Sequence, residues 1–427
     1  MLRWADRLSD RGFMAWALGL NLALRVAVLV LVPLRQTSDF AWYFERAAGI
    51  AAGEGFAERG TLTAFWPVGW PGVLGGLFTV FGPHQAAGQV LNLGLSALTL
   101  LLLHALARQM FGDRRIARLA VVVIAVLPNQ VAYVPLLSTE IFYEVLLLAG
   151  AYCLLRQTAW FAAAAGLVFG VATLTKAQSP LLPPILIGAI WLYDRSRPGI
   201  PKLVRNAVLA CAVMAAVVAP WTLRNYQVFG VFIPVSTNGG FTLLTGNNPS
   251  ARGDYTPDDP LVAGLAGHPD RQVEIDRIAR ARAIAWISEN PGAFVRLMPL
   301  KFFRLWAPDG EAEWFYQAGY DRYDRNAMLF RAVRGLNQLL YVLLVLLALP
   351  ALALLWPSAR ASVPQLGWVL IGYFTAISLM FSGQSRFHFA LMPWIAMYAA
   401  WTAVGLWSRV RSRPDPAVRA ATQARSA

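Results

Sequence analysis

Long apolar stretches separated by short polar breaks dominate the pattern of this chain. A helix needs about 20 apolar residues to cross roughly 30 Å of hydrocarbon. About ten stretches approach that length, and we predict membrane-spanning helices at Phe13–Leu34, Gln85–Met110, Ile116–Val134, Ser138–Leu155, Ala159–Thr175, Pro180–Tyr193, Ala207–Leu223, Leu336–Trp356, Val363–Phe381 and Arg386–Trp407. The pattern therefore predicts an all-α polytopic membrane protein.

The loop at 35–84, between the first two predicted spans, contains two amphipathic segments. These are Phe40–Gly53 and Pro67–Phe81, joined by the turn-forming sequence "GEGFAERG". Neither is long and apolar enough to cross the membrane. We predict two helices lying on its surface.

The segment 224–326 is more polar and is predicted to be a small α+β insert outside the membrane. β-type runs at Phe229–Val235 and Phe241–Thr245 flank "TNGG" and predict a hairpin. A helix is expected at Pro269–Glu289. It is followed by an interfacial helix in "NPGAFVRLMPLKFFRLWAP", where Arg296, Lys301 and Arg304 alternate with apolar side chains.

Composition agrees with a membrane protein, because 57% of the residues are hydrophobic and only 14% are charged. Basic clusters at Arg108–Arg118, Arg195–Arg205 and Arg409–Arg413 are separated from the N-terminus and from one another by even numbers of predicted spans. The positive-inside rule then puts both termini in the cytoplasm and the loop 35–84 and the insert outside. The net charge of +14 indicates contact with anionic lipids, not nucleic acid.

This topology divides the chain into four parts. They are an N-terminal transmembrane catalytic module at 1–223, the insert at 224–326, C-terminal transmembrane helices at 327–408 and a basic cytoplasmic tail at 409–427. The two cysteines, Cys153 and Cys211, fall in predicted spans and imply no disulfide.

Two carboxylates mark the outer ends of predicted spans. Asp39, in "TSDFAWYF", follows the first span, and two interpretations stay open for it: a helix N-cap or a catalytic carboxylate. Glu140 opens the fourth span, where a helix dipole would also favour it. Glu144 lies one turn deeper, and we expect Arg25 of the first span as its partner.

Three cations are predicted at the same outer level. They are Lys176 in "TLTKAQSP", Arg224 in "PWTLRNY" and Arg386 in "GQSRFHF", with His388 beside the last. Cations at membrane ends often only contact lipid phosphate, but three on one face suit a bound phosphate better. We therefore expect Lys176, Arg224 and Arg386 to bind a phosphate, and His388 could donate to the same anion or ligate a metal.

Several segments in this order are similar to a known family. They are "SDFAWYFERAAGIAAGEGF", "FWPVGWPGVLGGLFTVFG", "LSTE", "PWTLRNYQVFG" followed by "STNGGFTLLTGNNP", "NPGAFVRLMPLKFFRLWAP" and "SRFHFALMPW". The chain resembles the polytopic lipid-dependent glycosyltransferases of the GT-C architecture. The resemblance is to the family-39-like group, which includes protein O-mannosyltransferases and lipid A aminoarabinose transferases.

The resemblance implies a sugar donor carried on a polyprenyl phosphate and an acceptor hydroxyl at the outer face, with inversion at the sugar. It implies that Asp39 is the essential acid and that Glu140 occupies the second acidic position. Residues of the same segments are expected to line the substrate pocket, namely Tyr43, Trp66, Asn225, Tyr226, Asn238 and Asn247.

The chain departs from the family pattern in three places. Lys176 stands where Arg is frequent, His388 stands where a second Arg is frequent, and Phe40 follows Asp39 where protein mannosyltransferases tend to have Glu. The last departure favours an envelope glycan or lipid acceptor over a protein.

Two other classes share parts of this pattern. A glycan ligase or polymerase with a polyprenyl-diphosphate donor would need the same outer cations, and a lipid flippase or transporter would also have about ten spans. The sequence defines no cofactor and no metal ligands, so a divalent metal stays open. We expect a multi-pass protein of the bacterial inner membrane with its active site on the periplasmic side.

Overall fold

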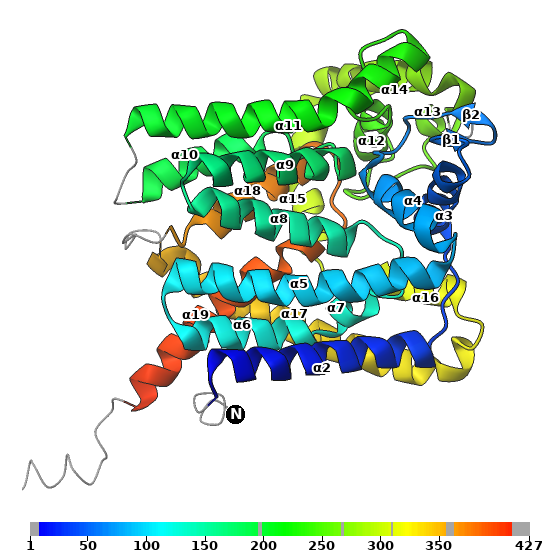
Figure 1. Cartoon of the computed structure of the whole chain (residues 1–427). Helices are drawn as coiled ribbons and strands as arrows, with labels where there is room; N and C mark the ends of the chain where they lie inside the picture. The colour runs from blue at the N-terminus through cyan, green and yellow to red at the C-terminus, as the bar shows by residue number, and fades with distance from the viewer. Residues whose placement is uncertain (1–7, 195–198, 266–268, 309–310, 356–362, 412–427) are drawn as a thin grey trace, which may run out of the picture.

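The computed structural model describes residues 8–194, 199–265, 269–308, 311–355 and 363–411. Helices running roughly side by side form a bundle, and smaller elements gather at one end of it (Figure 1). Every predicted span is helical in its main part. The helices concerned are α2 (Asp10–Leu31), α5 (Gln85–Phe111), α6 (Arg114–Val126), α8 (Glu140–Leu155), α9 (Ala159–Thr175), α10 (Leu182–Tyr193), α11 (Ile200–Phe229), α17 (Ala327–Leu355), α18 (Leu366–Met380) and α19 (Met392–Arg411).

Within the described part of the chain, five helical stretches are long and apolar enough to cross a membrane by themselves. They contain α2, α5, α11, α17 and α19. The other five helices of the bundle are shorter. The third predicted span is broken at Leu127, which has extended backbone before Pro128, so that a short helix α7 (Pro128–Ala132) follows α6. Proline disfavours helical geometry in the residue before it, which explains the break.

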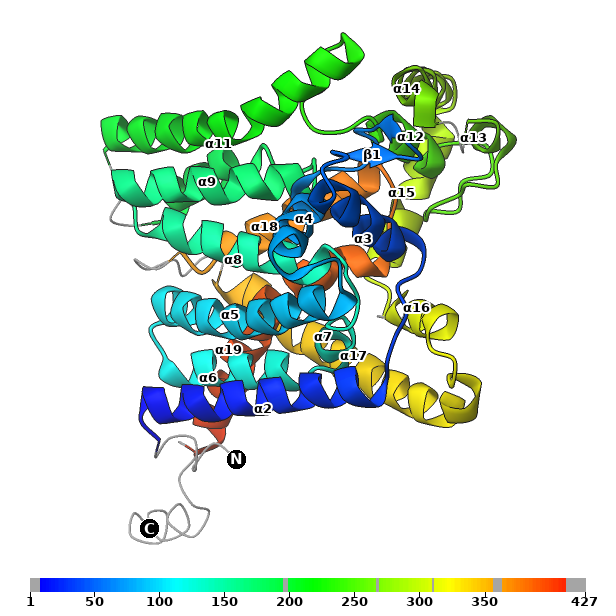
Figure 2. The same ribbon diagram turned by 45° about the vertical axis from the view of Figure 1, so that its right-hand side comes forward.

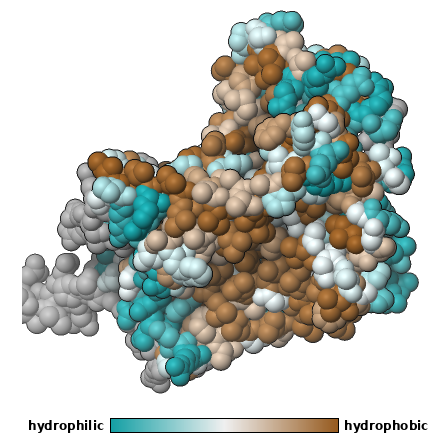
Figure 3. Space-filling model, turned by 45° about the horizontal axis from the view of Figure 1, so that its top comes forward, coloured by the Kyte–Doolittle hydropathy of each residue, from teal (hydrophilic) through white to brown (hydrophobic). Residues whose placement is uncertain are grey.

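The two ends of the bundle differ in character. The first residues of α2 and the last of α19 lie at one end, together with the connection from α5 to α6 (Figure 1). Small helices and the β-hairpin gather at the opposite end, called the loop end below. A space-filling view shows a broad apolar surface over the bundle with polar residues toward both ends (Figure 3). This distribution fits a bundle surrounded by lipid.

Both predicted surface helices of the first loop are present, as α3 (Ser38–Ala51) and α4 (Gly69–Phe81). Between them, β1 (Ala57–Glu58) and β2 (Thr61–Leu62) pair as a two-residue antiparallel hairpin. Arg59 and Gly60 at its tip have φ values of +51° and +78°. Positive φ at both positions is typical of the two-residue turns that connect hairpin strands. The sequence "AERG" therefore indicated a β-hairpin as well as a turn.

The hairpin predicted in the insert is wrong, because Gly239–Gly246 forms helix α12. Leu244 of α12 packs with Ile275 and Ala279 of α14 (Gln272–Glu289) in a small separate core. The carboxylate of Asp276 accepts a hydrogen bond of 2.5 Å from the backbone N–H of Gly240. Packing on α14 and this bond at the start of α12 outweigh the local β preference.

The other regular elements described in the insert are also helical. The predicted helix at Pro269–Glu289 is confirmed as η1 (Pro269–Arg271) and α14. The interfacial helix is α15 (Pro291–Leu305). The smaller elements are α13 (Pro260–Ala263), α16 (Glu311–Gly319) and η2 (Asp324–Asn326), and a 3-10 helix η3 (Ser385–Leu391) precedes α19.

Candidate active site

Asp39 and Arg386 form an ion pair at the loop end of the bundle. Both terminal nitrogens of Arg386 donate to Oδ2 of Asp39 at 3.1 Å. The N-cap of α3 is Thr37, and Asp39 lies in the first turn. The capping interpretation of Asp39 therefore does not hold, and its carboxylate faces a cation from the other end of the chain.

A second ion pair lies next to the first. Nζ of Lys176, which follows the last residue of α9, is 3.3 Å from Oε1 of Glu140, the first residue of α8. The ammonium also lies 5.4 Å from the ring of Tyr143 and 5.8 Å from the ring of Phe387. Since Phe387 follows Arg386 directly, the two ion pairs are adjacent.

Two tyrosines complete the neighbourhood of Asp39. Burial raises the pKa of Tyr43, and the charges of Asp39 and Glu140 raise it further, while Arg386 lowers it. Burial and the Asp39 charge also raise the pKa of Tyr255, a residue of the insert. Both phenols therefore stay protonated and can donate hydrogen bonds beside the carboxylates.

Helix α4 holds this arrangement over the ends of α8 and α9. The Nε1–H of the buried Trp70 donates to the carbonyl of Leu137 at 2.8 Å. A Cβ at Gly69 would lie 2.6 Å from the backbone of Leu174 and Thr175, so only glycine allows this approach. The views in Figures 1 and 2 agree that α3 and α4 lie at this end of the bundle.

His388 does not join the cluster, contrary to the prediction. Its ring is fully buried and stacks between Trp306 and Tyr341, with centroid separations of 5.7 and 4.9 Å. Nδ1 lies 2.6 Å from the carbonyl of Leu305. A 3-10 helix has three residues per turn, so side chains two positions apart, such as Arg386 and His388, point in different directions.

Arg224 has no described contact with either ion pair and binds backbone carbonyls instead. Its guanidinium donates to the carbonyls of Thr63 at 2.8 Å and Phe56 at 3.1 Å. It lies 4.7 Å from the ring of Trp221. Arg224 therefore fastens the β-hairpin loop to α11, and the described contacts give it no place in the phosphate site.

Of the six predicted pocket residues, only Tyr43 has a described interaction with the ion pairs. Asn225 and Asn247 are buried and donate to backbone carbonyls, those of Ile233 for the former and of Leu243 and Met380 for the latter. The other three lie elsewhere: Asn238 caps α12, Tyr226 is exposed on α11, and Trp66 is half-buried beside Phe65.

The expected pairing of Glu144 with Arg25 is not a direct contact. Glu144 accepts a hydrogen bond of 2.8 Å from Gln130. Arg25 donates to the carbonyl of Ala125 at 2.9 Å, at the last turn of α6 before the Pro128 break. The break in α6 leaves carbonyls without helical partners inside the bundle, and those of Ala125 and Ile124 accept hydrogen bonds from the terminal nitrogens of Arg25.

The described residues contain no group of three or more His, Cys, Asp or Glu side chains that could hold a metal. Asp39 and Glu140 each face a cation.

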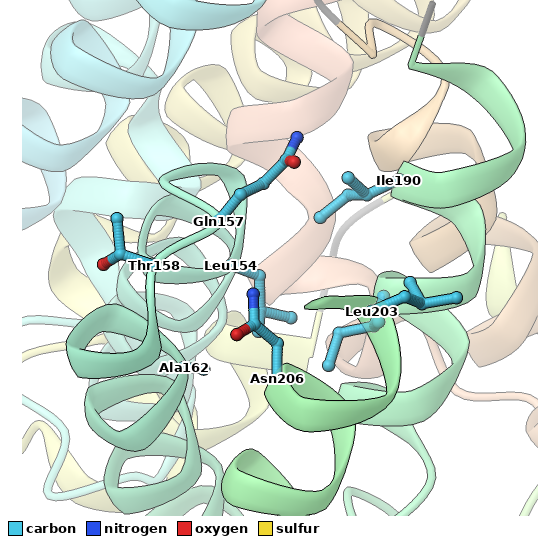
Figure 4. Close-up of a pocket in the computed structure, with 8 residues that line it drawn as sticks. Leu154, Gln157, Thr158, Ala162, Ile190, Leu203 and Asn206 are labelled. Atoms are coloured by element: carbon cyan, nitrogen blue, oxygen red, sulfur yellow. The ribbon is translucent and has the colours of Figure 1, made fainter. Parts of the chain in front are cut away.

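A small cavity lies at the opposite end of the bundle from these residues. Leu154, Gln157 and Asn206 are among its lining residues (Figure 4). Its volume of about 20 Å³ holds roughly one water molecule. A wider, open groove of about 260 Å³ lies between residues 231–237 and α14.

Lys301 was grouped with Arg296 and Arg304 in the prediction, but the structure separates it from them. Both arginines are exposed, whereas Lys301 is fully buried. The sequence could have predicted this burial. Lys301 is four residues from Leu297 and from Leu305, so all three share one helix face, and both leucines are buried.

Comparisons with known proteins agree with the fold and with the motifs. A family model described as dolichyl-phosphate-mannose-protein mannosyltransferase matches residues 66–223, which is less than half of the chain. No curated protein sequence matches.

Similar solved structures are those of the oligosaccharyltransferase from Archaeoglobus fulgidus. A complex with zinc and sulfate has a TM-score of 0.55 and 15% identity, over 93% of this chain and 49% of that chain. A complex of the same enzyme, AglB, with an inhibitory peptide and a dolichol-phosphate has a TM-score of 0.55 and 13% identity, over 97% and 52%. A third structure, tethered to an acceptor peptide, has a TM-score of 0.56 and 13% identity, over 96% and 51%.

These similarities show a helical membrane fold of the GT-C type, and the fold class predicted from the sequence is confirmed. The chain spans about half the length of the archaeal enzyme. Both comparisons are with enzymes of glycosyl transfer, as the sequence motifs predicted.

Proposed function

We propose that this chain is an integral membrane glycosyltransferase that moves a sugar from a polyprenyl-phosphate donor to an acceptor hydroxyl at the outer membrane face. The observation that carries the proposal is the meeting of Asp39, Glu140, Lys176 and Arg386 at one end of the bundle. These residues come from four separate segments. The matched family and the dolichol-phosphate bound to AglB support a lipid-phosphate donor.

The two cations suit the leaving phosphate. When the bond between the sugar and the phosphate oxygen breaks, the electron pair stays on the phosphate, and Arg386 and Lys176 stabilise that charge. Arg386 can donate two parallel N–H bonds to two phosphate oxygens, whereas Lys176 provides a compact point charge. Glu140 holds the Lys176 ammonium in place through its 3.3 Å contact.

Asp39 is the proposed base. The acceptor oxygen attacks the anomeric carbon from the side opposite the phosphate, and its proton passes to the Asp39 carboxylate. This single displacement inverts the configuration at that carbon. Tyr43 stays protonated and can hydrogen-bond to the sugar or to Asp39.

The basic termini and the polar loop end favour a plasma membrane protein with a cytoplasmic N-terminus and an outer active site. The acceptor proposed is an envelope glycan or a lipid. A glycan ligase with a diphosphate-linked donor is the second candidate, because the similar solved structures reported above are of an oligosaccharyltransferase.

The test is turnover in reconstituted vesicles with either a polyprenyl-phosphate sugar or a polyprenyl-diphosphate glycan, followed by mass spectrometry of lipid products. We expect release of polyprenyl phosphate from the first donor only, and a loss of roughly 100-fold to 10,000-fold in Asp39→Asn. Turnover of the diphosphate donor alone would favour the ligase. Movement of lipid without bond cleavage would indicate a transporter.

A further inference from the structure

The buried Lys301 of α15 contacts the ends of α12 and α18, and α18 precedes Arg386 in the chain. Nζ of Lys301 on α15 lies 2.6 Å from Oδ1 of Asn247, 3.2 Å from the carbonyl of Leu379 and 3.4 Å from that of Met380. The Nδ2 of Asn247 donates to the same Met380 carbonyl at 3.0 Å. The lysine and the asparagine together satisfy carbonyls that the end of α18 leaves without helical partners.

Close backbone contacts surround this cluster. A Cβ at Gly383 would lie 1.9 Å from the carbonyl oxygen of Lys301, and one at Gly246 would lie 1.9 Å from that of Phe381. The N–H of Gly383 donates to the carbonyl of Gly253 at 2.9 Å. The turn between α18 and η3 therefore lies between α15 and an earlier part of the insert, residues 246–253, and Arg386 is the second residue after this turn.

Packing alone does not account for a lysine at this position. Among the described residues, no carboxylate lies within ion-pair distance of Nζ, and burial lowers the pKa of Lys301 to about 8. The neighbouring charges, Asp254 and Arg304, pair with each other at 3.5 Å. An apolar side chain would avoid the cost of burying the ammonium, but it would leave the three oxygen acceptors without this donor.

We propose that Lys301 is a positioning residue for Arg386. By holding the end of α18 against α15 and against Asn247 at the end of α12, it sets the position at which the guanidinium binds the donor phosphate. This inference rests on the proposed function, in which Arg386 binds that phosphate. It also makes donor binding depend on the insert, through Asn247.

The test is a double-mutant cycle on the donor KM, measured with a polyprenyl-phosphate sugar in vesicles. Lys301→Met should raise the donor KM about 10-fold to 100-fold, as expected for a displaced binding group, and should change kcat much less. In an Arg386→Gln background the same substitution should have almost no further effect, because its action passes through Arg386. Arg296→Gln, on the same helix but exposed, is the matched control and should leave KM unchanged.

Asn247→Ser provides a milder second variant, because it keeps Lys301 and removes its shortest contact. It should also raise the donor KM, and this effect should again disappear in the Arg386→Gln background. If Lys301→Met does not fold, Asn247→Ser replaces it in the test. Equal KM increases in both backgrounds would overturn the inference. A normal donor KM in Arg386→Gln alone would instead refute the phosphate role in the proposed function.

Discussion

Oδ2 of Asp39 lies 3.1 Å from two nitrogens of Arg386, a residue 347 positions further along the chain. The loop between α2 and α5 and the segment before α19 therefore build the site together. In the proposed mechanism, the donor phosphate and the Asp39 carboxylate bind the same guanidinium. Donor binding should draw Arg386 away from Asp39 and leave that carboxylate free to accept the proton.

This competition predicts a specific effect of Asp39→Asn on binding. Removing the charge frees Arg386, so polyprenyl phosphate should bind equally well or up to about fivefold tighter, the size of a partly exposed ion pair. The measurement is a titration followed by tryptophan fluorescence in detergent. Weaker binding in Asp39→Asn would contradict the competition between the carboxylate and the phosphate.

The ion pair between Lys176 and Glu140 predicts that its effect on protein stability can be separated from its effect on donor binding. Lys176→Met should weaken polyprenyl-phosphate binding by about 1.5–3 kcal/mol, and more so at low salt. It also leaves the buried Glu140 carboxylate unpaired, which should cost about 3 kcal/mol of stability. Adding Glu140→Gln should restore thermal stability but not binding. Recovery of both would show that Lys176 acts only through the fold.

Arg224 is predicted to stabilise the fold and not to bind the donor. Arg224→Gln removes donors to two loop carbonyls and should cost about 1–3 kcal/mol in unfolding free energy. The donor affinity of the folded fraction should keep its original dependence on salt, whereas that of Arg386→Gln should become less sensitive to salt. A salt-sensitive loss equal to that of Arg386→Gln would return Arg224 to the phosphate site.

The orientation is tested by labelling single cysteines in a background where Cys153 and Cys211 are replaced by alanine. A membrane-impermeant maleimide should label Asp258→Cys in intact cells. It should label Arg114→Cys and Lys202→Cys only after permeabilisation, because these exposed positions lie at the other end of the bundle. The reverse result would invert the topology.

Lys301 predicts a pH dependence of stability. Burial lowers its pKa to about 8 from an ordinary value of 10.5, so between these pH values the unfolded chain binds a proton that the folded chain does not. Stability should therefore rise with pH across this window, by up to about 3 kcal/mol relative to Lys301→Met. Thermal unfolding of both proteins at about pH 7 and about pH 10 measures the difference. An unchanged difference would contradict the lowered pKa.

Much of the fold follows from apolar periodicity, since every predicted span is helical and both surface helices of the first loop form. The predicted hairpin failed because Gly239 and Gly240 start a helix that only packing on α14 favours. Periodicity reports the local environment along one chain segment, not which distant segment covers it.

The candidate site was predicted in part for the same reason. Asp39, Glu140, Lys176 and Arg386 stand at span ends, and the alternation of spans brings such ends together. Arg224 and His388 stand at similar places in the sequence, but their side chains turn to a loop carbonyl and to two aromatic rings. The direction of a side chain depends on helix geometry and neighbours, which the sequence alone did not reveal.

The burial of the second ion pair has a consequence for substrate choice. The side chain of Glu140 is 4% exposed and that of Lys176 is 19% exposed. The donor phosphate would therefore have to enter the protein to reach them. We expect the enzyme to select its donor by the depth its phosphate can reach: changing the length of the prenyl tail should barely alter KM, whereas a bulkier diphosphate should be rejected.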